Sequence, residues 1–227
     1  MAIHPKSSLN ISTMLHILSK QPSIANRFIS ELRDHEIQTD RMRFRLNLER
    51  LGEVFAYEIS KLMRYDYHEV ETPLGVARTS LSETQPVIAS VLRAGLPLQS
   101  GMIRFFDKAD TAFVGTYRNI KKSGNFELHT DYQTTPGLDG RTLIITDALL
   151  ATGRTMVMVA KQLIQEQELY QLHLVSALAS EEGLTHVRAH LPKAHIWVGD
   201  VDQELTSKLY LVPGLGDAGD LAYGPKT

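Results

Sequence analysis

The stretch Leu143–Thr155, Leu-Ile-Ile-Thr-Asp-Ala-Leu-Leu-Ala-Thr-Gly-Arg-Thr, sets the expectations for the whole chain. It predicts a short apolar strand, an acidic residue at its carboxyl end, and a turn rich in glycine and hydroxyl groups that opens a helix. The backbone N–H groups of such a turn, with the partial positive charge of a helix N-terminus, suit a phosphate. A plain strand-to-helix connection whose threonines only cap the helix would give the same pattern, so two interpretations stay open.

Asp147 and the turn that follows it carry complementary chemistry. The Asp147 carboxylate, at the strand end, suits hydrogen bonds from the vicinal hydroxyls of a sugar. The backbone N–H groups and hydroxyls of Thr152, Gly153, Arg154 and Thr155 suit a phosphate. This order of groups predicts a site for a ribose 5-phosphate.

Strand-like apolar runs alternate with helical patterns along most of the chain. The expected strands span residues 86–92, 111–117, 143–146, 172–178 and 196–198, and the expected helices span 39–63, 95–106, 181–190 and a segment from about 153. This alternation predicts an α/β fold with a mostly parallel twisted sheet and helices on both faces. A polar stretch at residues 118–125 adds a long, mobile β-hairpin arm. Ligands of open sheets bind beyond the carboxyl ends of the strands, where Arg93, Asp147, Thr152 and Asp200 are expected to lie.

Composition narrows the classes of partner and compartment. The 227 residues carry 24 Lys and Arg against 26 Asp and Glu, so no overall positive field recruits nucleic acid. The absence of cysteine excludes disulfides, thiolate catalysis and cysteine zinc sites, and it fits a reducing compartment. No apolar run approaches the ~18 residues of a membrane span. We therefore expect a cytoplasmic protein that binds small molecules rather than nucleic acid or a membrane.

One domain over residues 1–227 is the expected organisation, in three parts. Residues 1 to about 63 form a helical segment, and residues from about 64 to 200 form the core. Residues from about 201 to 227 form a loop over the site, the C-terminal hood. The first segment contains an apolar helical stripe formed by Ile11, Met14, Leu15 and Leu18. Its longest helix carries arginines spread around the surface, which favours a solvated or subunit-facing role: Arg41, Arg43, Arg45 and Arg50.

A second strand-to-helix junction, Val91–Pro97, carries a cation where the first carries Asp147. Gly95 permits a close backbone approach, and Pro97 suits a first helical turn. Arg93 at this junction suits bidentate binding of a pyrophosphate. An arginine that anchors its own loop through backbone carbonyls would give the same sequence, and both interpretations stay open.

The segment Tyr210–Asp220, Tyr-Leu-Val-Pro-Gly-Leu-Gly-Asp-Ala-Gly-Asp, is dense in glycine. It formally satisfies G-x-G-x-x-G, but the chain ends too soon after Gly219 to form a helix inside a βαβ unit, which excludes a dinucleotide fingerprint. The backbone amides and carbonyls of such a loop suit the edge of a flat heterocycle, and a flexible tail is the alternative. Tyr210 either covers such a heterocycle or packs in the core, and core packing is favoured.

Four motifs, taken together, resemble the uracil phosphoribosyltransferases, a family of type I phosphoribosyltransferases. They occur in the same order and at similar spacing as in that family, and the likeness covers most of the chain. The motifs are Leu92–Leu96, Thr116–Asn119, Asp147–Gly153 and Leu211–Asp220. The last of them is highly specific within the type I enzymes, whereas the other three are more widely shared.

The resemblance implies a role for each matching position. Arg93 and Arg118 match arginines that contact phosphoribosyl pyrophosphate. The ribose and 5-phosphate loop corresponds to Asp147, Ala148, Leu149, Leu150, Ala151, Thr152, Gly153, Arg154 and Thr155. Positions that bind uracil largely through the main chain correspond to Leu211, Gly216 and Ala218. Asp217 matches an aspartate beside the uracil that contacts the sugar donor, and the residues expected to carry catalysis are Asp147, Arg93 and Asp217.

The implied reaction transfers the 5-phosphoribosyl group of phosphoribosyl pyrophosphate to N1 of uracil, giving uridine monophosphate and pyrophosphate. Mg²⁺ is the implied cofactor, bound mainly through phosphoribosyl pyrophosphate rather than by a protein metal site. A homodimer or higher homo-oligomer is also expected. Two alternatives on the same fold stay open: a pyrimidine-responsive RNA-binding regulator and an inactive homologue.

Overall fold

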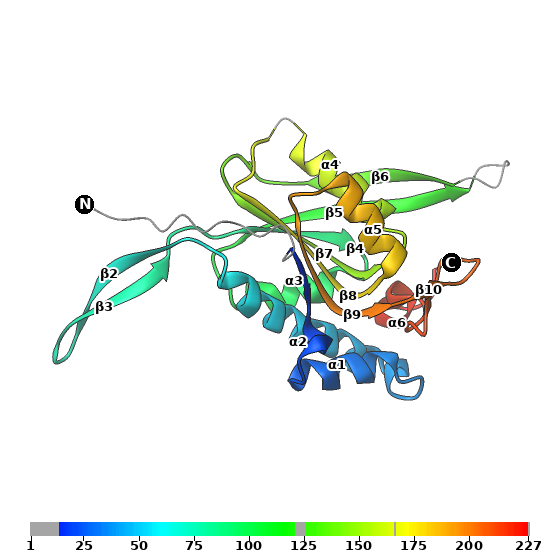
Figure 1. Ribbon diagram of the computed structural model, residues 1–227, viewed down its shortest axis with the longest axis horizontal. Helices are drawn as coiled ribbons and strands as arrows, with labels where there is room; N and C mark the ends of the chain where they lie inside the picture. Colours follow the sequence, from blue (N-terminus) through cyan, green and yellow to red (C-terminus); the bar gives the residue numbers. More distant parts are fainter. Residues whose placement is uncertain (1–13, 121–125, 166, 227) are drawn as a thin grey trace.

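A largely parallel sheet forms the centre of the molecule (Figure 1). The computed structural model describes residues 14–120, 126–165 and 167–226. Within these residues seven strands lie in the order β1-β9-β8-β7-β4-β5-β6, and only the β5–β6 pair is antiparallel. The strands are β1 (Leu15–Ile17), β4 (Val87–Leu92), β5 (Asp110–Ile120), β6 (Phe126–Thr134), β7 (Thr142–Leu150), β8 (Gln171–Ser180) and β9 (His195–Asp202).

Helices cover both faces of the sheet, which confirms the predicted fold class (Figure 1). One face packs against α1 (Ile24–Arg33), α2 (Arg41–Ser60) and α3 (Leu96–Ile103). The other face packs against α4 (Arg154–Ile164) and α5 (Glu181–His190). Two short 3-10 helices, η2 (Leu18–Lys20) and η3 (Ile37–Thr39), complete the N-terminal part. No helix of the described residues is long and apolar enough to cross a membrane.

The predicted helical stripe near the N-terminus is wrong where the structure describes it. Leu15–Ile17 form β1, which runs parallel to β9 at the edge of the sheet, and Ile11 lies outside the described residues. Backbone pairing explains the difference, because the Ile196 N–H donates to the Met14 carbonyl at 2.7 Å and the ladder continues along β9. Pairing with a sheet edge outweighs a local helical pattern of only a few residues.

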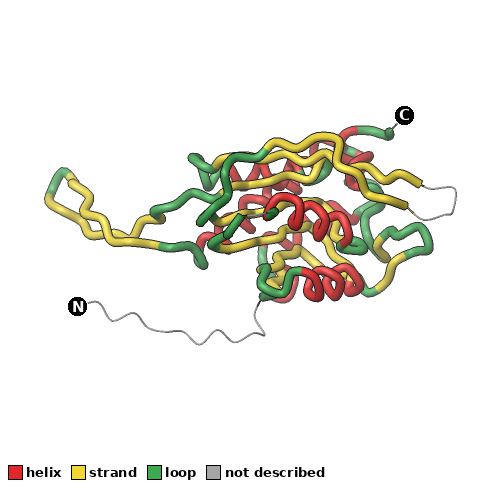
Figure 2. Tube along the Cα trace, turned by 90° about the horizontal axis from the view of Figure 1, so that it is seen from above, coloured by secondary structure: helices red, strands yellow, loops and turns green. Residues whose placement is uncertain are grey.

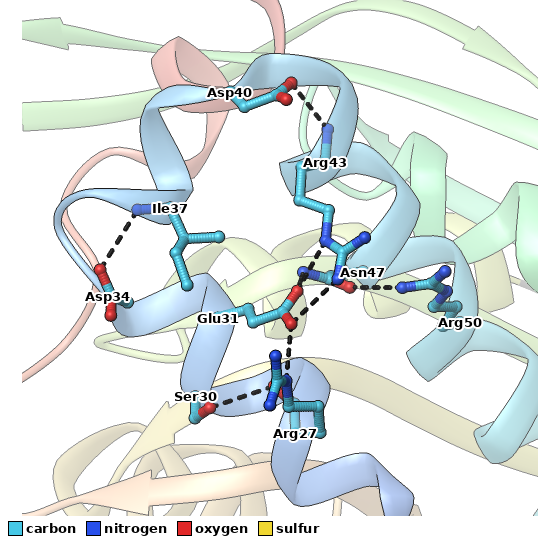
Figure 3. Close-up of polar contacts among 9 residues, drawn as sticks. All are labelled: Arg27, Ser30, Glu31, Asp34, Ile37, Asp40, Arg43, Asn47 and Arg50. Carbon is cyan, nitrogen blue, oxygen red and sulfur yellow. Dashed lines mark hydrogen bonds and ion pairs between the residues drawn. The ribbon is translucent and has the colours of Figure 1, made fainter.

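Two of the arginines on α2 do more than form a solvated surface. Figure 3 shows Arg43 and Asn47 of α2 beside Glu31 of α1. The Glu31 carboxylate accepts hydrogen bonds from Arg43 Nε at 2.7 Å, Asn47 Nδ2 at 2.8 Å and Arg27 Nε at 2.7 Å. These bonds hold the pKa of the buried Glu31 carboxyl well below its usual range. Arg45 reaches the other way and donates to the Ala222 carbonyl at 2.7 Å.

Two β-hairpins project from the molecule (Figures 1 and 2). The predicted hairpin is present as the antiparallel β5–β6 pair, whose residues 121–125 lie outside the described part. The second hairpin, β2 (Tyr65–Thr72) with β3 (Gly75–Ser82), was not predicted and forms a separate two-stranded sheet. Nearly all of its residues are exposed, so its sequence carries no buried face to reveal it.

The C-terminal hood is more structured than the predicted loop. β10 (Glu204–Leu205) pairs with β11 (Leu211–Val212), and α6 (Ala218–Tyr223) follows. The Asp217 side chain caps α6 by accepting a hydrogen bond from the Asp220 N–H at 3.0 Å. An aspartate before a helix is a recognised start signal, but the glycines around it favoured a loop. α6 packs on α2 and belongs to the same apolar cluster as α1 to α3.

Candidate active site

A cleft of about 680 Å³ lies between the carboxyl ends of the central strands and the C-terminal hood. The ends of β4 and β7 form one wall, through residues that include Arg93 and Asp147. The hood forms the opposite wall, through residues that include Leu211 and Asp217. The structure therefore brings Asp147 of β7 and the glycine-dense segment together, as predicted.

Asp147 reaches the cleft because of how β7 pairs with its neighbours. The β4–β7 ladder ends at Ser90 and Thr146, whereas β7 continues beside β8, with Asp147 opposite Ser176. The strand runs to Leu150, four residues beyond its predicted end. Asp147 thus lies one residue beyond the point where β4 and β7 stop pairing, at the cleft.

Only part of the predicted ribose-phosphate loop faces the cleft. Asp147, Leu149, Ala151 and Thr155 line it. The other residues of the loop do not line the cleft: Ala148, Leu150, Thr152, Gly153 and Arg154. Four of these residues are buried and hold the loop in place from the side away from the cleft: Ala148, Leu150, Thr152 and Gly153.

Gly153 is the residue on which the turn depends. It has a φ of 72° and is the N-cap of α4. A Cβ at this position would lie 2.7 Å from the Gly183 carbonyl oxygen of α5, so a side chain fits neither the conformation nor the space. The close packing of the turn on α5 fixes the N-terminus of α4 beside the cleft.

Arg93 lies at the β4–α3 junction and lines the cleft. Its guanidinium donates to Asp220 Oδ1 at 2.8 Å and to the Gly224 carbonyl at 3.1 Å. The structure thus shows an anchored Arg93, with one change from the interpretation that the sequence offered, and pyrophosphate binding by Arg93 stays a prediction. The backbone carbonyl that anchors Arg93 belongs to the C-terminal hood and not to its own loop.

The hood is held against the rest of the molecule by Arg33 of α1. Arg33 donates to the Gly214 carbonyl at 3.1 Å and to both Asp202 and Asp200, at 2.7 and 2.9 Å. Asp202 in turn accepts the Gly214 N–H at 3.1 Å. These contacts favour the ordered-loop interpretation of the glycine-dense segment over a flexible tail.

Asp200 was expected beyond a strand end, but it lies within β9, which continues to Asp202, and it does not line the cleft. It binds Arg33 and accepts a hydrogen bond from Ser19 at 2.7 Å. Burial alone would raise the pKa of the Asp200 carboxyl, but the hydrogen bonds from Ser19 and Arg33 outweigh burial and lower that pKa. Asp200 therefore anchors α1 through Arg33 and η2 through Ser19.

All four predicted hood residues line the cleft, and the structure adds residues that sequence reasoning missed. Leu211 and Ala218 are buried, and Gly216 has a φ of 94°. Lys208 and Lys226 also line the cleft, but no motif marked either lysine. The expected core packing of Tyr210 is wrong, because its side chain is 44% exposed at the cleft. Arg118 belongs to β5, and its side chain lies outside the described part.

Comparison with known proteins places this chain in a family. A family model described as uracil phosphoribosyltransferase matches residues 18–225. The chain belongs to the uracil phosphoribosyltransferase family. A uracil phosphoribosyltransferase from Porphyromonas gingivalis is 44% identical over 210 residues, covering 92% of this chain and 97% of the relative. One from Thermococcus gammatolerans is 38% identical over 199 residues, covering 86% and 87%.

Solved structures agree with the family assignment at the level of the fold. The AQ2163 protein from Aquifex aeolicus is 29% identical, with a TM-score of 0.82 over 92% of this chain and 98% of that protein. Adenine phosphoribosyl transferase from Trypanosoma brucei is only 10% identical, with a TM-score of 0.56 over 92% and 90%. The fold of the uracil phosphoribosyltransferase family thus extends to a distant phosphoribosyltransferase.

Proposed function

We propose that this chain transfers the 5-phosphoribosyl group of phosphoribosyl pyrophosphate to N1 of uracil, giving uridine monophosphate and pyrophosphate. The observation that carries the proposal is the cleft, in which Asp147 and Arg93 on one wall face Asp217 and the hood on the other. Membership of the uracil phosphoribosyltransferase family supports the same reaction. In this reaction a bond forms between uracil N1 and C1′ as the bond from C1′ to the pyrophosphate oxygen breaks.

The β7–α4 wall binds the ribose and its 5-phosphate. The Asp147 carboxylate accepts hydrogen bonds from the ribose hydroxyls, and its negative charge stabilises the positive charge that develops on the ring in the transition state. The Thr155 hydroxyl and the backbone N–H groups at the start of α4 bind the 5-phosphate. Ala148, Leu150 and Thr152, which are buried, hold this backbone in place. Arg154, the first residue of α4, adds a positive charge close to that phosphate.

The pyrophosphate lies toward Arg93, whose guanidinium suits two phosphate oxygens at once. Arg118 on β5 is the second arginine proposed for this group. Lys208 and Lys226, which line the same cleft, add positive charge that the sequence did not predict. These cations neutralise the charge that builds up on the leaving pyrophosphate.

Uracil lies against the hood. The main chain of Leu211, Gly216 and Ala218 presents donors and acceptors to one edge of the base, and Tyr210 covers its face. Uracil offers acceptor, donor and acceptor along that edge, whereas cytosine differs at two of the three positions. A backbone arranged for uracil leaves groups unpaired with cytosine, which disfavours cytosine by several kcal/mol. Asp217, beside the base, contacts the sugar donor.

Mg²⁺ is the proposed cofactor. Within the described residues no three His, Cys, Asp or Glu side chains gather as a metal site. The cleft carboxylates Asp147 and Asp217 fit an ion that is held mainly by pyrophosphate oxygens and water, the coordination that Mg²⁺ favours beside phosphates. When bound, the ion neutralises pyrophosphate charge, and the chain orients the two substrates around it.

The β2–β3 hairpin supports the expected self-association. It exposes Tyr65, Tyr67, Val70, Leu74 and Val76, and Leu74 is fully exposed. An isolated two-stranded hairpin is marginally stable in water, so we propose that a second copy of this chain covers it. Mass photometry at micromolar concentration tests for this homodimer or higher homo-oligomer.

The cytoplasmic location stays a prediction, for which the absence of cysteine is the support.

The test of the function is an assay for uridine monophosphate. The purified chain is incubated with uracil, phosphoribosyl pyrophosphate and Mg²⁺, and the products are separated by chromatography. We expect uridine monophosphate and pyrophosphate in equal amounts, with cytosine replacing uracil poorly. If no pyrimidine base gives a product, the proposal is overturned, and a binding or regulatory role is favoured instead.

A further inference from the structure

The side chain of Arg93 is held in place by hydrogen bonds to the hood. One guanidinium nitrogen donates to Asp220 Oδ1 at 2.8 Å, and another donates to the Gly224 carbonyl at 3.1 Å. The third nitrogen, Nε, is buried and has no hydrogen-bond partner among the described residues. The side chain nevertheless stays 34% exposed and lines the cleft. Two of its three nitrogens are thus committed to α6 and its C-terminal end.

Asp220 is itself held in a defined position. Its backbone N–H donates to the Asp217 side chain, which caps α6. Gly219 leaves room for this approach, since a Cβ there would lie a tight 3.2 Å from both Arg93 Nη2 and Asp217 Oδ1. At the far end of α6, Arg45 of α2 donates to the Ala222 carbonyl at 2.7 Å. The Asp220 carboxylate is therefore carried by a helix anchored at both ends.

The Arg93–Asp220 pair is too exposed to act mainly through folding stability. Its side chains are 34% and 38% exposed, and ion pairs of this kind contribute little to stability. An arginine side chain has several rotatable bonds, and binding a ligand with it costs the entropy of fixing them. A carboxylate that fixes the guanidinium before the ligand arrives removes that cost.

We propose that Asp220 is a positioning residue for the transfer reaction. It holds the Arg93 guanidinium at the cleft so that its remaining N–H donors meet the pyrophosphate of the sugar donor. Asp217 caps α6 and Asp220 lies within it, so the position of the hood and the orientation of Arg93 depend on the same helix. The inference rests on the proposed function, and it adds a residue that acts through Arg93 rather than on the substrate.

The test is a double-mutant cycle between D220N and R93A. The quantity measured for each variant is kcat/KM for phosphoribosyl pyrophosphate. We expect D220N to lower this value about 10- to 100-fold, the size of effect that follows from a misplaced catalytic group. D220A, which also removes the acceptor oxygen, should lower it further. In the R93A background D220N should change kcat/KM less than twofold, because Asp220 acts through Arg93. A structural role would give additive losses in the cycle.

D110N is the matched control. Asp110 pairs with Arg141 at 2.6 Å, with comparably exposed side chains, and neither residue lines the cleft. It should leave kcat/KM within twofold of the parent chain. The inference is overturned if D220N behaves like D110N, if its effect adds to that of R93A, or if it tightens phosphoribosyl pyrophosphate binding, since Asp220 would then compete for Arg93. A parent chain without turnover would instead overturn the proposed function, so the two failures are distinguishable.

Discussion

The two walls of the cleft are built in different ways. The β7–α4 wall consists of consecutive residues, placed by strand pairing and by one glycine turn. The hood wall is held by arginines that come from three distant elements, Arg33 of α1, Arg45 of α2 and Arg93 after β4. The sugar-phosphate wall thus comes from one continuous stretch of sequence, whereas the base wall depends on charged contacts with distant elements. Substitutions in the two walls should therefore have different effects on turnover, on KM for uracil and on stability.

The largest effect is expected on the β7–α4 wall. Asp147→Asn removes the negative charge proposed to stabilise the ring in the transition state and should lower kcat about 1,000-fold. The free energy of unfolding should change by less than about 1 kcal/mol, because the amide has the same shape. Steady-state kinetics and urea unfolding measure the two quantities. Turnover close to that of the parent chain would remove Asp147 from the reaction.

Arg33→Met removes the contacts between α1 and the hood wall. It leaves the buried Asp202 carboxylate without its cation, which should lower the free energy of unfolding by about 2–4 kcal/mol. The KM for uracil should rise more than the KM for phosphoribosyl pyrophosphate, since Gly214 loses an anchor. Urea unfolding and initial rates give both values.

Arg104→Met is the control for Arg33→Met. Arg104 also binds two carboxylates, Glu49 and Glu53, but on the exposed surface. Its loss should cost less than about 1 kcal/mol. Equal costs for the two variants would show that the hood does not depend on the buried pair.

Acid should destabilise a third region, remote from both walls. His173 lies near the amino end of β8, stacked beside His195, and accepts a hydrogen bond from Trp197 Nε1 at 3.0 Å. Burial, then the neighbouring His195 and His16, lower the pKa of His173 to about 3. The unfolded chain, with a histidine pKa of about 6.5, therefore binds more protons than the folded chain below that pH.

The expected pH dependence follows from this sign. Stability is fully present above about pH 6.5 and is lost as the pH falls toward about 3, with a loss of about 2 kcal/mol by pH 5. Urea unfolding at pH 7 and pH 5 measures the loss, and H173N should show a smaller difference. Equal loss in H173N would assign the acid sensitivity to other groups.

The smallest effect is expected from Arg45→Met. It removes the bond to the Ala222 carbonyl and the contact over the Tyr223 ring, and should raise the KM for uracil about threefold to tenfold. Arg50→Met serves as the control, since Arg50 on the same helix contacts Asn47 and the Phe28 ring. A rise in KM for both variants alike would mean that α2 as a whole, and not Arg45, supports the hood.

The features that could be predicted from the sequence are those of the β7–α4 wall more than those of the hood wall. The order of strand, Asp147, glycine turn and helix was predictable because each step depends on neighbouring residues. β1 was not, since its strand conformation comes from pairing with the distant β9. The placement of Lys208, Tyr210 and Lys226 depends on how the hood folds back, which no local pattern carries. Arg93 lay between these cases, because its place was predictable and its partners in the hood were not.

The central claim is that Asp147 of β7 and the C-terminal hood form one site that joins a base to a sugar phosphate. A crystal structure with uridine monophosphate bound tests it most directly, because this product carries both groups. We predict the uracil ring against the main chain of Leu211, Gly216 and Ala218, with the phosphate at the start of α4 beside Thr155. A nucleotide that contacts only one wall, or lies outside the cleft, would contradict the account.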